Sequence, residues 1–283
     1  MDESVSDFQR QGFLSLQSEQ NAQAFRKTSG DWAKCFLDVN ECAQRAFHTI
    51  KLSERDYRRI LAYSVFYRLL TAYQSVFLLT ERGIDIESKV LLRTMTEALL
   101  VLKATVRVDD FASRYIRSDE DSRRRLLEKT MRVTEESLQR GEKLFVSQIG
   151  LEQMRADLES LRAQRSANSL VPEMRKEEIA REAGLENVYN MHFAFFSMFT
   201  HLTATGMRQL FDVNEDGRIT TFKSGIYYED AYANLRVAMV FMLSALSAVN
   251  EFFALDISKN ISALEERLES LCESAQAGDQ NSD

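Results

Sequence analysis

Proline is almost absent from this sequence, since Pro172 is the only one in 283 residues. Proline breaks helix interiors and is common in turns and at strand edges, so its scarcity excludes frequent helix breaks and favours long helices. Glycine is also scarce, with ten residues, whereas the apolar content of 45% is enough to fill a core. The composition therefore excludes a disordered chain and predicts an all-α protein.

Cysteine is equally scarce, and the three residues, Cys35, Cys42 and Cys272, are widely scattered. They are too few for a disulfide framework and do not form a C-x-x-C metal site. Cys35 and Cys42 lie one heptad apart, on one face of the same predicted helix. We therefore expect a protein of a reducing compartment, the cytoplasm.

The motifs of common cofactor and catalytic sites are also missing. The sequence contains no G-x-G-x-x-G, G-x-x-x-x-G-K-[ST], H-E-x-x-H or G-x-S-x-G. Of its three histidines, His48 lies on a different predicted helix from His192 and His201, which argues against a three-histidine metal site. We expect no cofactor and no bound metal.

Long apolar runs are absent too. The most apolar stretch, Val237–Val249, has 13 residues, whereas a membrane span needs roughly 20. The N-terminal residues MDESVSDFQRQGF carry acids where a secretory signal would be basic. We therefore expect neither a membrane protein nor export. A net charge of -7 opposes a surface that coats nucleic acid generally, but it is compatible with a local basic patch.

Apolar residues recur in the sequence at spacings of three and four, which is the period of an amphipathic helix. Ser53 and Asp56 form the pattern of a capping box, and Gly83 with Asp85 marks a short turn between two antiparallel helices. No helix is predicted before residue 30. Helices are predicted over residues 31–47, 54–82, 86–108, 173–183, 186–203, 229–255 and 258–274.

These helices predict one helical-bundle domain over residues 31–275, after a polar N-terminal segment, 1–30, and before a disordered tail, 276–283. Residues 109–172 are heavily charged and predict an excursion of exposed helices that ends in a linker, 166–172. Residues 205–228 predict a turn or hairpin segment. Its signal is Asp216-Gly217 between two short apolar runs, Phe211/Val213 and Ile219/Phe222.

The same segment resembles part of a calcium-binding loop. Residues Asp212 to Ile219 reproduce the first eight positions of an EF-hand, in which the twelfth should be a bidentate glutamate. The twelfth residue here is Lys223, whose positive charge opposes calcium. We therefore interpret the segment as a hairpin turn and predict no calcium binding.

Two charged residues interrupt an apolar helix face. Arg93 and Glu97 lie one turn apart, on the same side as Ile86, Val90, Leu100 and Ala104. Lys89, Thr96 and Lys103 are expected to form a neighbouring polar side of that helix. The pair is either a salt bridge that locks helices together, as partly buried charges commonly are, or part of a functional site.

A second helix carries a narrow polar stripe. In YNMHFAFFSMFTHL, aromatic on nearly every side, Asn190, Ala194, Ser197 and His201 share one face, and Tyr189 begins the helix. We expect the His201 ring to lie in or beside the core. There it serves either helix packing, with its nitrogens hydrogen-bonded, or proton exchange.

The two helices together resemble a known family. The pattern L-x-R-x-x-x-E-A from Leu91 to Ala98 follows a long helix containing YRLLTAYQSVFLL, and Tyr189, Ser197 and His201 come after the charged excursion. Over roughly 58–207 this is similar to the bacterial family catalogued as domain of unknown function 5677. The resemblance implies a helical bundle in which Arg93, Glu97, Tyr189, Ser197 and His201 converge from two helices. It implies no activity.

A looser similarity is to the HEPN ribonucleases of toxin and defence systems, small helical bundles that act as dimers. It implies a homodimer and an RNA substrate. Their motif has an arginine four to six residues before a histidine, whereas no arginine stands at that distance before His192 or His201. Only Arg93, reaching His201 from a neighbouring helix, would restore such a pair.

Two hypotheses follow. In the first, the site acts on RNA or a phosphate-bearing ligand in a defence, toxin or stress role. Arg93 then holds phosphate, His201 is the acid or base, and Glu97 orients one of them. In the second, the chain is a non-catalytic scaffold or oligomerisation module. A site needs a pocket beside His201, whereas a structural cluster needs its polar atoms paired within the protein.

Overall fold

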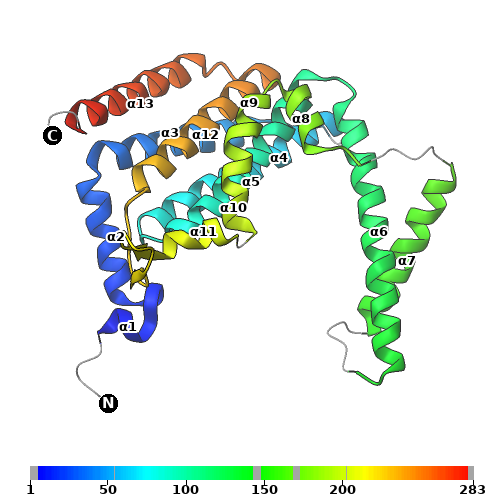
Figure 1. Ribbon diagram of the computed structural model, residues 1–283. Coiled ribbons are helices and arrows are strands. Elements are labelled where there is room, and N and C mark those ends of the chain that lie inside the picture. Colours follow the sequence, from blue (N-terminus) through cyan, green and yellow to red (C-terminus); the bar gives the residue numbers. More distant parts are fainter. Residues whose placement is uncertain (1–5, 54, 143–147, 168–172, 202, 280–283) are drawn as a thin grey trace. The chain divides into compact units, whose positions relative to one another are not determined.

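The computed structural model describes residues 6–53, 55–142, 148–167, 173–201 and 203–279. Most of these residues lie in helices, and one two-stranded antiparallel hairpin is the only sheet within the described ranges (Figure 1). The predicted all-α fold is confirmed.

The chain divides into two compact units, each with its own contacts. One unit comprises Met1–Arg107 with Ala180–Asp283, and the other comprises Val108–Ile179. The predicted charged excursion, 109–172, falls within the second unit. Helix α8 (Lys176–Ala183) includes the boundary between the two.

The larger unit contains most of the elements. Before the boundary they are α1 (Asp7–Gln11), η1 (Gly12–Leu14), α2 (Leu16–Thr28), α3 (Gly30–Thr49), α4 (Tyr57–Thr80) and α5 (Asp85–Arg107). After it they are α9 (Glu186–Val188), η2 (Tyr189–Phe193), α10 (Ala194–Thr200), α11 (Ala204–Met207), η3 (Arg208–Leu210), β1 (Phe211–Val213), β2 (Ile219–Phe222), α12 (Ala231–Phe253) and α13 (Ser258–Asp279). Helix α13 thus extends beyond its predicted end near residue 274, and residues 280–283 of the predicted tail lie outside the described residues.

The core of this unit is built round α4, α5 and α12, with α3 packed against α4 and α12. The ring of Phe36 stacks on Tyr73, with 3.9 Å between centroids, and the Tyr73 hydroxyl donates to the Phe36 carbonyl. Helix α12 is long and apolar enough to span a membrane by length and composition alone. However, 61% of its apolar window is buried inside the protein, so core packing accounts for its character.

Helices α4 and α5 are antiparallel neighbours because the turn between them is very short, as predicted. Asp56 caps α4 by accepting from the Arg59 backbone N–H, so the helix begins three residues later than predicted. Gly83 ends the turn at φ +69°, in the left-handed region that favours glycine. A Cβ there would lie 2.5 Å from Ile226 Cγ2 and 2.8 Å from the Tyr227 nitrogen. The turn therefore requires glycine for both its conformation and its packing.

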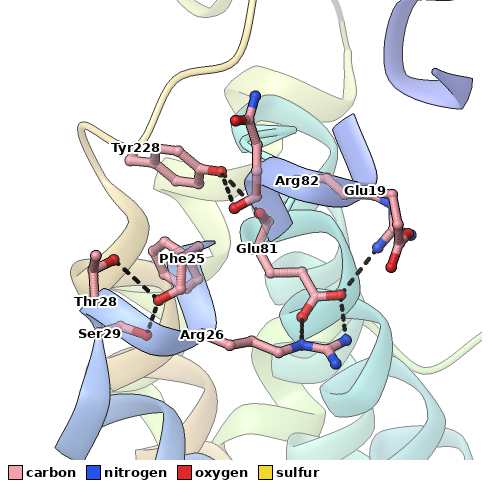
Figure 2. A network of polar contacts seen from close by, with 9 residues as sticks. Glu19, Phe25, Arg26, Thr28, Ser29, Glu81, Arg82 and Tyr228 are labelled. Carbon is pink, nitrogen blue, oxygen red and sulfur yellow. Dashed lines mark hydrogen bonds and ion pairs between the residues drawn. The ribbon is translucent and has the colours of Figure 1, made fainter. Parts of the chain in front are cut away.

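No helix is predicted in residues 1–30, but the described part of this range, from residue 6 on, contains the α-helices α1 and α2 and the short 3-10 helix η1. Phe25 of α2 joins the core, where its ring stacks on Tyr228 at 4.9 Å. Figure 2 shows the polar network beside it: the Glu81 carboxylate, with no exposed surface, accepts from Arg26 Nε at 2.5 Å and from Arg82 Nη1 at 3.0 Å. The Tyr228 hydroxyl donates to the Glu81 carbonyl at 2.9 Å. This network anchors α2 to the end of α4.

The predicted hairpin is confirmed. Strands β1 and β2 pair antiparallel, with Phe211 opposite Phe222, and Gly217 takes φ +77° in the turn. The Lys223 ammonium lies 3.3 Å from Asp212 Oδ1 and 3.0 Å from Glu229 Oε2, which raises the pKa of Lys223. The residue at the twelfth EF-hand position therefore pairs with the carboxylate at the first.

The smaller unit consists mainly of two helices, α6 (Phe111–Gln139) and α7 (Gln148–Ala167), which pack on each other. Their contact buries a few apolar side chains, among them Met131, Leu151 and Leu158. Glu128 pairs with Arg124 and Arg162, which links α6 to α7. The exposed helices predicted for this segment are present; of the predicted linker, 168–172 lie outside the described residues.

Candidate functional site

Arg93 and Glu97 form the predicted pair on α5. Arg93 Nη2 lies 3.2 Å from Glu97 Oε1, and the two side chains are 20% and 29% exposed. Arg93 Nε also donates to Ser197 Oγ at 3.1 Å, and its guanidinium covers the Phe193 ring at 4.6 Å. The guanidinium thus contacts a carboxylate, a hydroxyl and an aromatic face, which is how a half-buried arginine is normally satisfied.

The helix opposite Arg93 is not the single helix predicted over residues 186–203. It begins as α9, widens into a π-helix, η2, and continues as α10. Tyr189 stacks on Phe193 across this π-helix at 4.9 Å, and the Ser197 hydroxyl donates to the Phe193 carbonyl at 2.6 Å. Phe193 therefore links Tyr189 to Arg93. We define the Arg93 cluster as Arg93, Glu97, Tyr189, Phe193 and Ser197.

His201 lies outside the Arg93 cluster. Helix α10 ends at Thr200, and the His201 side chain is exposed, making no hydrogen bond, ion pair or ring contact with another described residue. The expectation that its ring lies in or beside the core is wrong. Asn190 and Ala194 of the same stripe are exposed too, because the buried face of α10 is formed by Phe196 and Phe199.

His192, rather than His201, lies beside the core, and it is half-buried. Its ring stacks on Phe196 at 6.0 Å and meets the edge of Phe241 on α12 at 5.4 Å. Burial lowers the pKa of His192 because the protonated form loses its hydration there. An imidazole held neutral among aromatic rings serves packing at neutral pH.

The polar side predicted for α5 is largely buried instead. Lys89 is 2% exposed, and its ammonium donates to Asp85 and Asp230 at 2.6 Å and to Gln209 at 2.7 Å. Asn234 of α12 donates to Asp85 at 2.7 Å. We call these residues the Lys89 network. It ties α5 to the segments that precede and begin α12.

The Lys89 network lies beside a cavity of about 230 Å³ lined by Asp85, Gln209, Tyr227 and Asp230, among others. Of the four acidic residues that line this cavity, Asp85 and Asp230 already accept hydrogen bonds from Lys89. Sequence analysis missed the network, although the Asp85 and Lys89 spacing of four, with an asparagine in the most apolar helix, is a usable signal. Within the described ranges, no cluster of three or more His, Cys, Asp or Glu residues has the arrangement of a metal site.

The Arg93 cluster can hold two helices together and can present a partly exposed guanidinium. Proton transfer by His201 would need that ring beside Arg93, whereas the described contacts of Arg93 are with Glu97, Ser197 and Phe193. Four of the five predicted site residues are therefore joined by contacts through Arg93 and Phe193, and the side chain of the fifth, His201, has no contact with them.

Comparison with known proteins gives a family match for the part of the chain that carries the Arg93 cluster. No curated protein and no solved structure matches it. The similarity to HEPN ribonucleases finds no support in these comparisons and stays a prediction. A family described as a family of unknown function, DUF5677, matches residues 59–218, a range that includes most of α4, all of α5 and the whole Arg93 cluster. Because this match covers more than half of the sequence, the chain belongs to the DUF5677 family.

Proposed function

We propose that this protein acts by binding, as a non-catalytic helical scaffold, and that the Arg93 cluster is a structural lock. The observation that carries the proposal is the pairing of Arg93. Its guanidinium contacts Glu97, Ser197 and the Phe193 ring at the same time. A side chain used in this way holds the π-helix on α5, and its charge is offset within the protein.

A second candidate is the binding of RNA or another phosphate-bearing ligand, in the cytoplasm and by a homodimer, in a defence, toxin or stress role. The observation that favours it is the π-helix, because such insertions are rare and often occur at functional sites. Arg93 keeps 20% of its side chain exposed, and Asn190 and His201 are exposed on the same segment. In this reading Arg93 holds phosphate, His201 is the acid or base, and Glu97 orients one of them.

The decisive variant is the double change Arg93→Leu with Glu97→Leu, which removes both charges without leaving either one unpaired. Fluorescence anisotropy with a labelled single-stranded RNA measures ligand binding, and growth arrest or phage restriction on expression measures biological activity. If the protein is a scaffold, the double variant and His201→Gln should both keep their biological activity in proportion to their soluble abundance. Arg218→Gln, on the exposed hairpin, is the control for loss of one arginine.

RNA binding that is saturable in the wild type and lost in the double variant, but kept in Arg218→Gln, would contradict the scaffold proposal. Loss of activity in His201→Gln at normal solubility would also contradict it. That result would assign the exposed imidazole to chemistry, because its ring stabilises no described part of the fold.

A further inference from the structure

A groove of about 470 Å³ lies between α12 and α13, and no residue of the Arg93 cluster lines it. Its apolar lining comes from Val240 and Leu243 on α12 and from Leu268 on α13. Leu243 and Leu268 are buried, whereas Val240 is half-exposed. The volume lies within the range of pockets that bind small molecules, roughly 300 to 1,000 Å³.

Lys103 of α5 reaches this groove and is the most informative residue in it. Its side chain is mostly buried, but it makes no hydrogen bond or ion pair with any described residue. Burial lowers its pKa, and the nearby charge of Glu251 only partly opposes that effect. The ammonium itself keeps contact with water, and an anion that replaces this water gains a positive partner that no described residue satisfies. Lys89, on the same helix, is buried with three acceptors, so the two lysines differ in what satisfies them.

Other polar groups of α12 line the same groove. Ser244 and Ser247 offer hydroxyls beside the apolar lining, and Arg236 lies further along the helix. Arg236 is exposed and also makes no hydrogen bond or ion pair with a described residue. From Arg236 to Ser247 the helix rises about 16 Å, the length of an extended small molecule rather than of a single ion.

The outer side of the groove is acidic. Glu265 and Glu269 of α13 line it, but both are exposed to solvent, where water and salt screen their charge. The Lys103 side chain, in contrast, is mostly buried, so its charge is screened less than theirs. A negative group is therefore favoured at the inner end of the groove, and a positive group only at its exposed rim.

We propose that the groove between α12 and α13 binds a small amphipathic anion, with its carboxylate or phosphate at Lys103 and its apolar body on Val240, Leu243 and Leu268. The hydroxyls of Ser244 and Ser247 then donate to the same anionic group. Such a ligand supplies Lys103 with a counter-charge and covers the exposed surface of Val240. This site is separate from the scaffold role proposed above and does not depend on it.

The test compares three probes with the same alkyl chain, by calorimetric titration of the full chain. Octanoate and octyl phosphate carry the expected anionic head in its two forms, and octylamine carries a cation. We expect saturable binding of at least one anion, at least tenfold tighter than octylamine. The better of octanoate and octyl phosphate identifies the class of head group. Equal affinity for anion and amine, or no saturable binding of either anion, would overturn the proposal.

Variants then assign the charge. Lys103→Met keeps the length and the apolar stem of the side chain, and we expect it to weaken anion binding at least tenfold while sparing octylamine. Lys259→Met on α13, an exposed lysine outside the groove lining, is the matched control and should change neither. Glu269→Gln should tighten anion binding, in the opposite direction.

A measurement on the wild-type protein tests the site even if the variants do not fold. Cys272 lines the groove and is partly exposed, whereas Cys35 and Cys42 are buried. Saturating octanoate or octyl phosphate should slow alkylation of Cys272 by iodoacetamide at least fivefold, as followed by mass spectrometry of its peptide. An unchanged alkylation rate under saturating ligand would place the bound molecule elsewhere and refute the proposed site.

Discussion

At the scale of single residues, the contacts of Arg93 show how one charge can serve three neighbours. Glu97 offsets the positive charge, the Ser197 hydroxyl accepts a hydrogen bond from Arg93 Nε, and the face of Phe193 covers the guanidinium plane. Each contact alone is worth about 1 kcal/mol or less when partly exposed. Their combination fixes the side chain in one position, because a rotation that improves one contact would break another.

Removing Arg93 therefore costs more than a surface ion pair. We expect Arg93→Ala to lower the free energy of unfolding by about 2 kcal/mol, since it removes the ion pair with Glu97 and the guanidinium that covers Phe193. The double change Arg93→Leu with Glu97→Leu should recover at least half of this loss. Urea denaturation of the three proteins measures both effects. Equal midpoints for wild type and Arg93→Ala would show that the cluster contributes no stability.

We expect His192 to make the stability of the protein depend on pH. Its pKa in the folded state is lowered by burial from the ordinary value of 6.5, so the unfolded chain takes up the proton at a higher pH than the folded one. The stability should therefore fall as the pH drops below 6.5 and level off below the folded-state pKa. His192→Phe, which keeps the ring contacts with Phe196 and Phe241, should flatten this part of the profile.

Thermal melts from pH 7.5 to 5 on wild type and His192→Phe check this prediction. His201→Gln is the matched control for loss of a histidine at an exposed position. Parallel profiles for wild type and His192→Phe would mean that the slope comes from other groups.

The sequence predicts part of the Arg93 cluster and fails where helix geometry changes. Arg93 and Glu97 are four residues apart on a continuous helix, so their contact follows from the helical period. The predicted place of His201 assumes a regular helix over 186–203. The π-helix at 189–193 instead changes which residues of the following helix face the core, and α10 ends at Thr200, before His201. The partners of Lys89 could not be predicted, because Gln209 and Asp230 come from segments more than a hundred residues away.

At the scale of elements, the turn between α4 and α5 depends on Gly83. Its φ of +69° and the close approach of Ile226 and Tyr227 both oppose any side chain. We expect Gly83→Ala to destabilise the protein by at least about 2 kcal/mol, because conformational strain and a clash add together. Gly217 has a similar φ of +77°, but a Cβ at that residue would have no neighbour within 4 Å, so Gly217→Ala should cost about 1 kcal/mol.

Chemical denaturation of the two variants separates strain from packing, because both glycines have positive φ and only Gly83 is crowded. A loss at Gly83 no larger than the loss at Gly217 would show that the segment at Ile226 moves aside without cost.

Elements with strong apolar patterns are predicted well from the sequence, and weakly patterned ones are not. The turn signals at Gly83 and Asp216-Gly217 correctly predict the antiparallel pair α4 and α5 and the hairpin. Helix α2 is missed because it places few residues in the core, chiefly Ala22 and Phe25, so it lacks the repeated apolar spacing that marks a helix. Its attachment comes from polar contacts with Glu81, which no local pattern reveals.

At the scale of the whole molecule, the two units have cores of very different size. The core of the larger unit draws on many fully buried side chains, whereas the contact between α6 and α7 in the smaller unit buries only a few, among them Met131, Leu151 and Leu158. Local stability follows buried apolar contact, so we expect α6 and α7 to unfold before α4, α5 and α12. Calorimetry should then show more than one transition.

Hydrogen exchange tests the order of unfolding. The amides of α6 and α7 should exchange at least tenfold faster than those of α4 and α5. A single transition with uniform protection would show that the two units unfold together.

The contact of Glu81 with Arg26 has a consequence for the evolution of the family. Glu81 lies inside the range that matches DUF5677, residues 59–218, whereas Arg26 precedes it. Arg26 makes the shorter of the two ion pairs of the buried Glu81 carboxylate, and Arg82 alone would replace only part of it, so positions 26 and 81 should change together across family members. We expect members without an arginine equivalent to Arg26 to carry an uncharged residue in place of Glu81. The acquisition or loss of an N-terminal helix would then leave its record at a position more than fifty residues away, inside the shared domain.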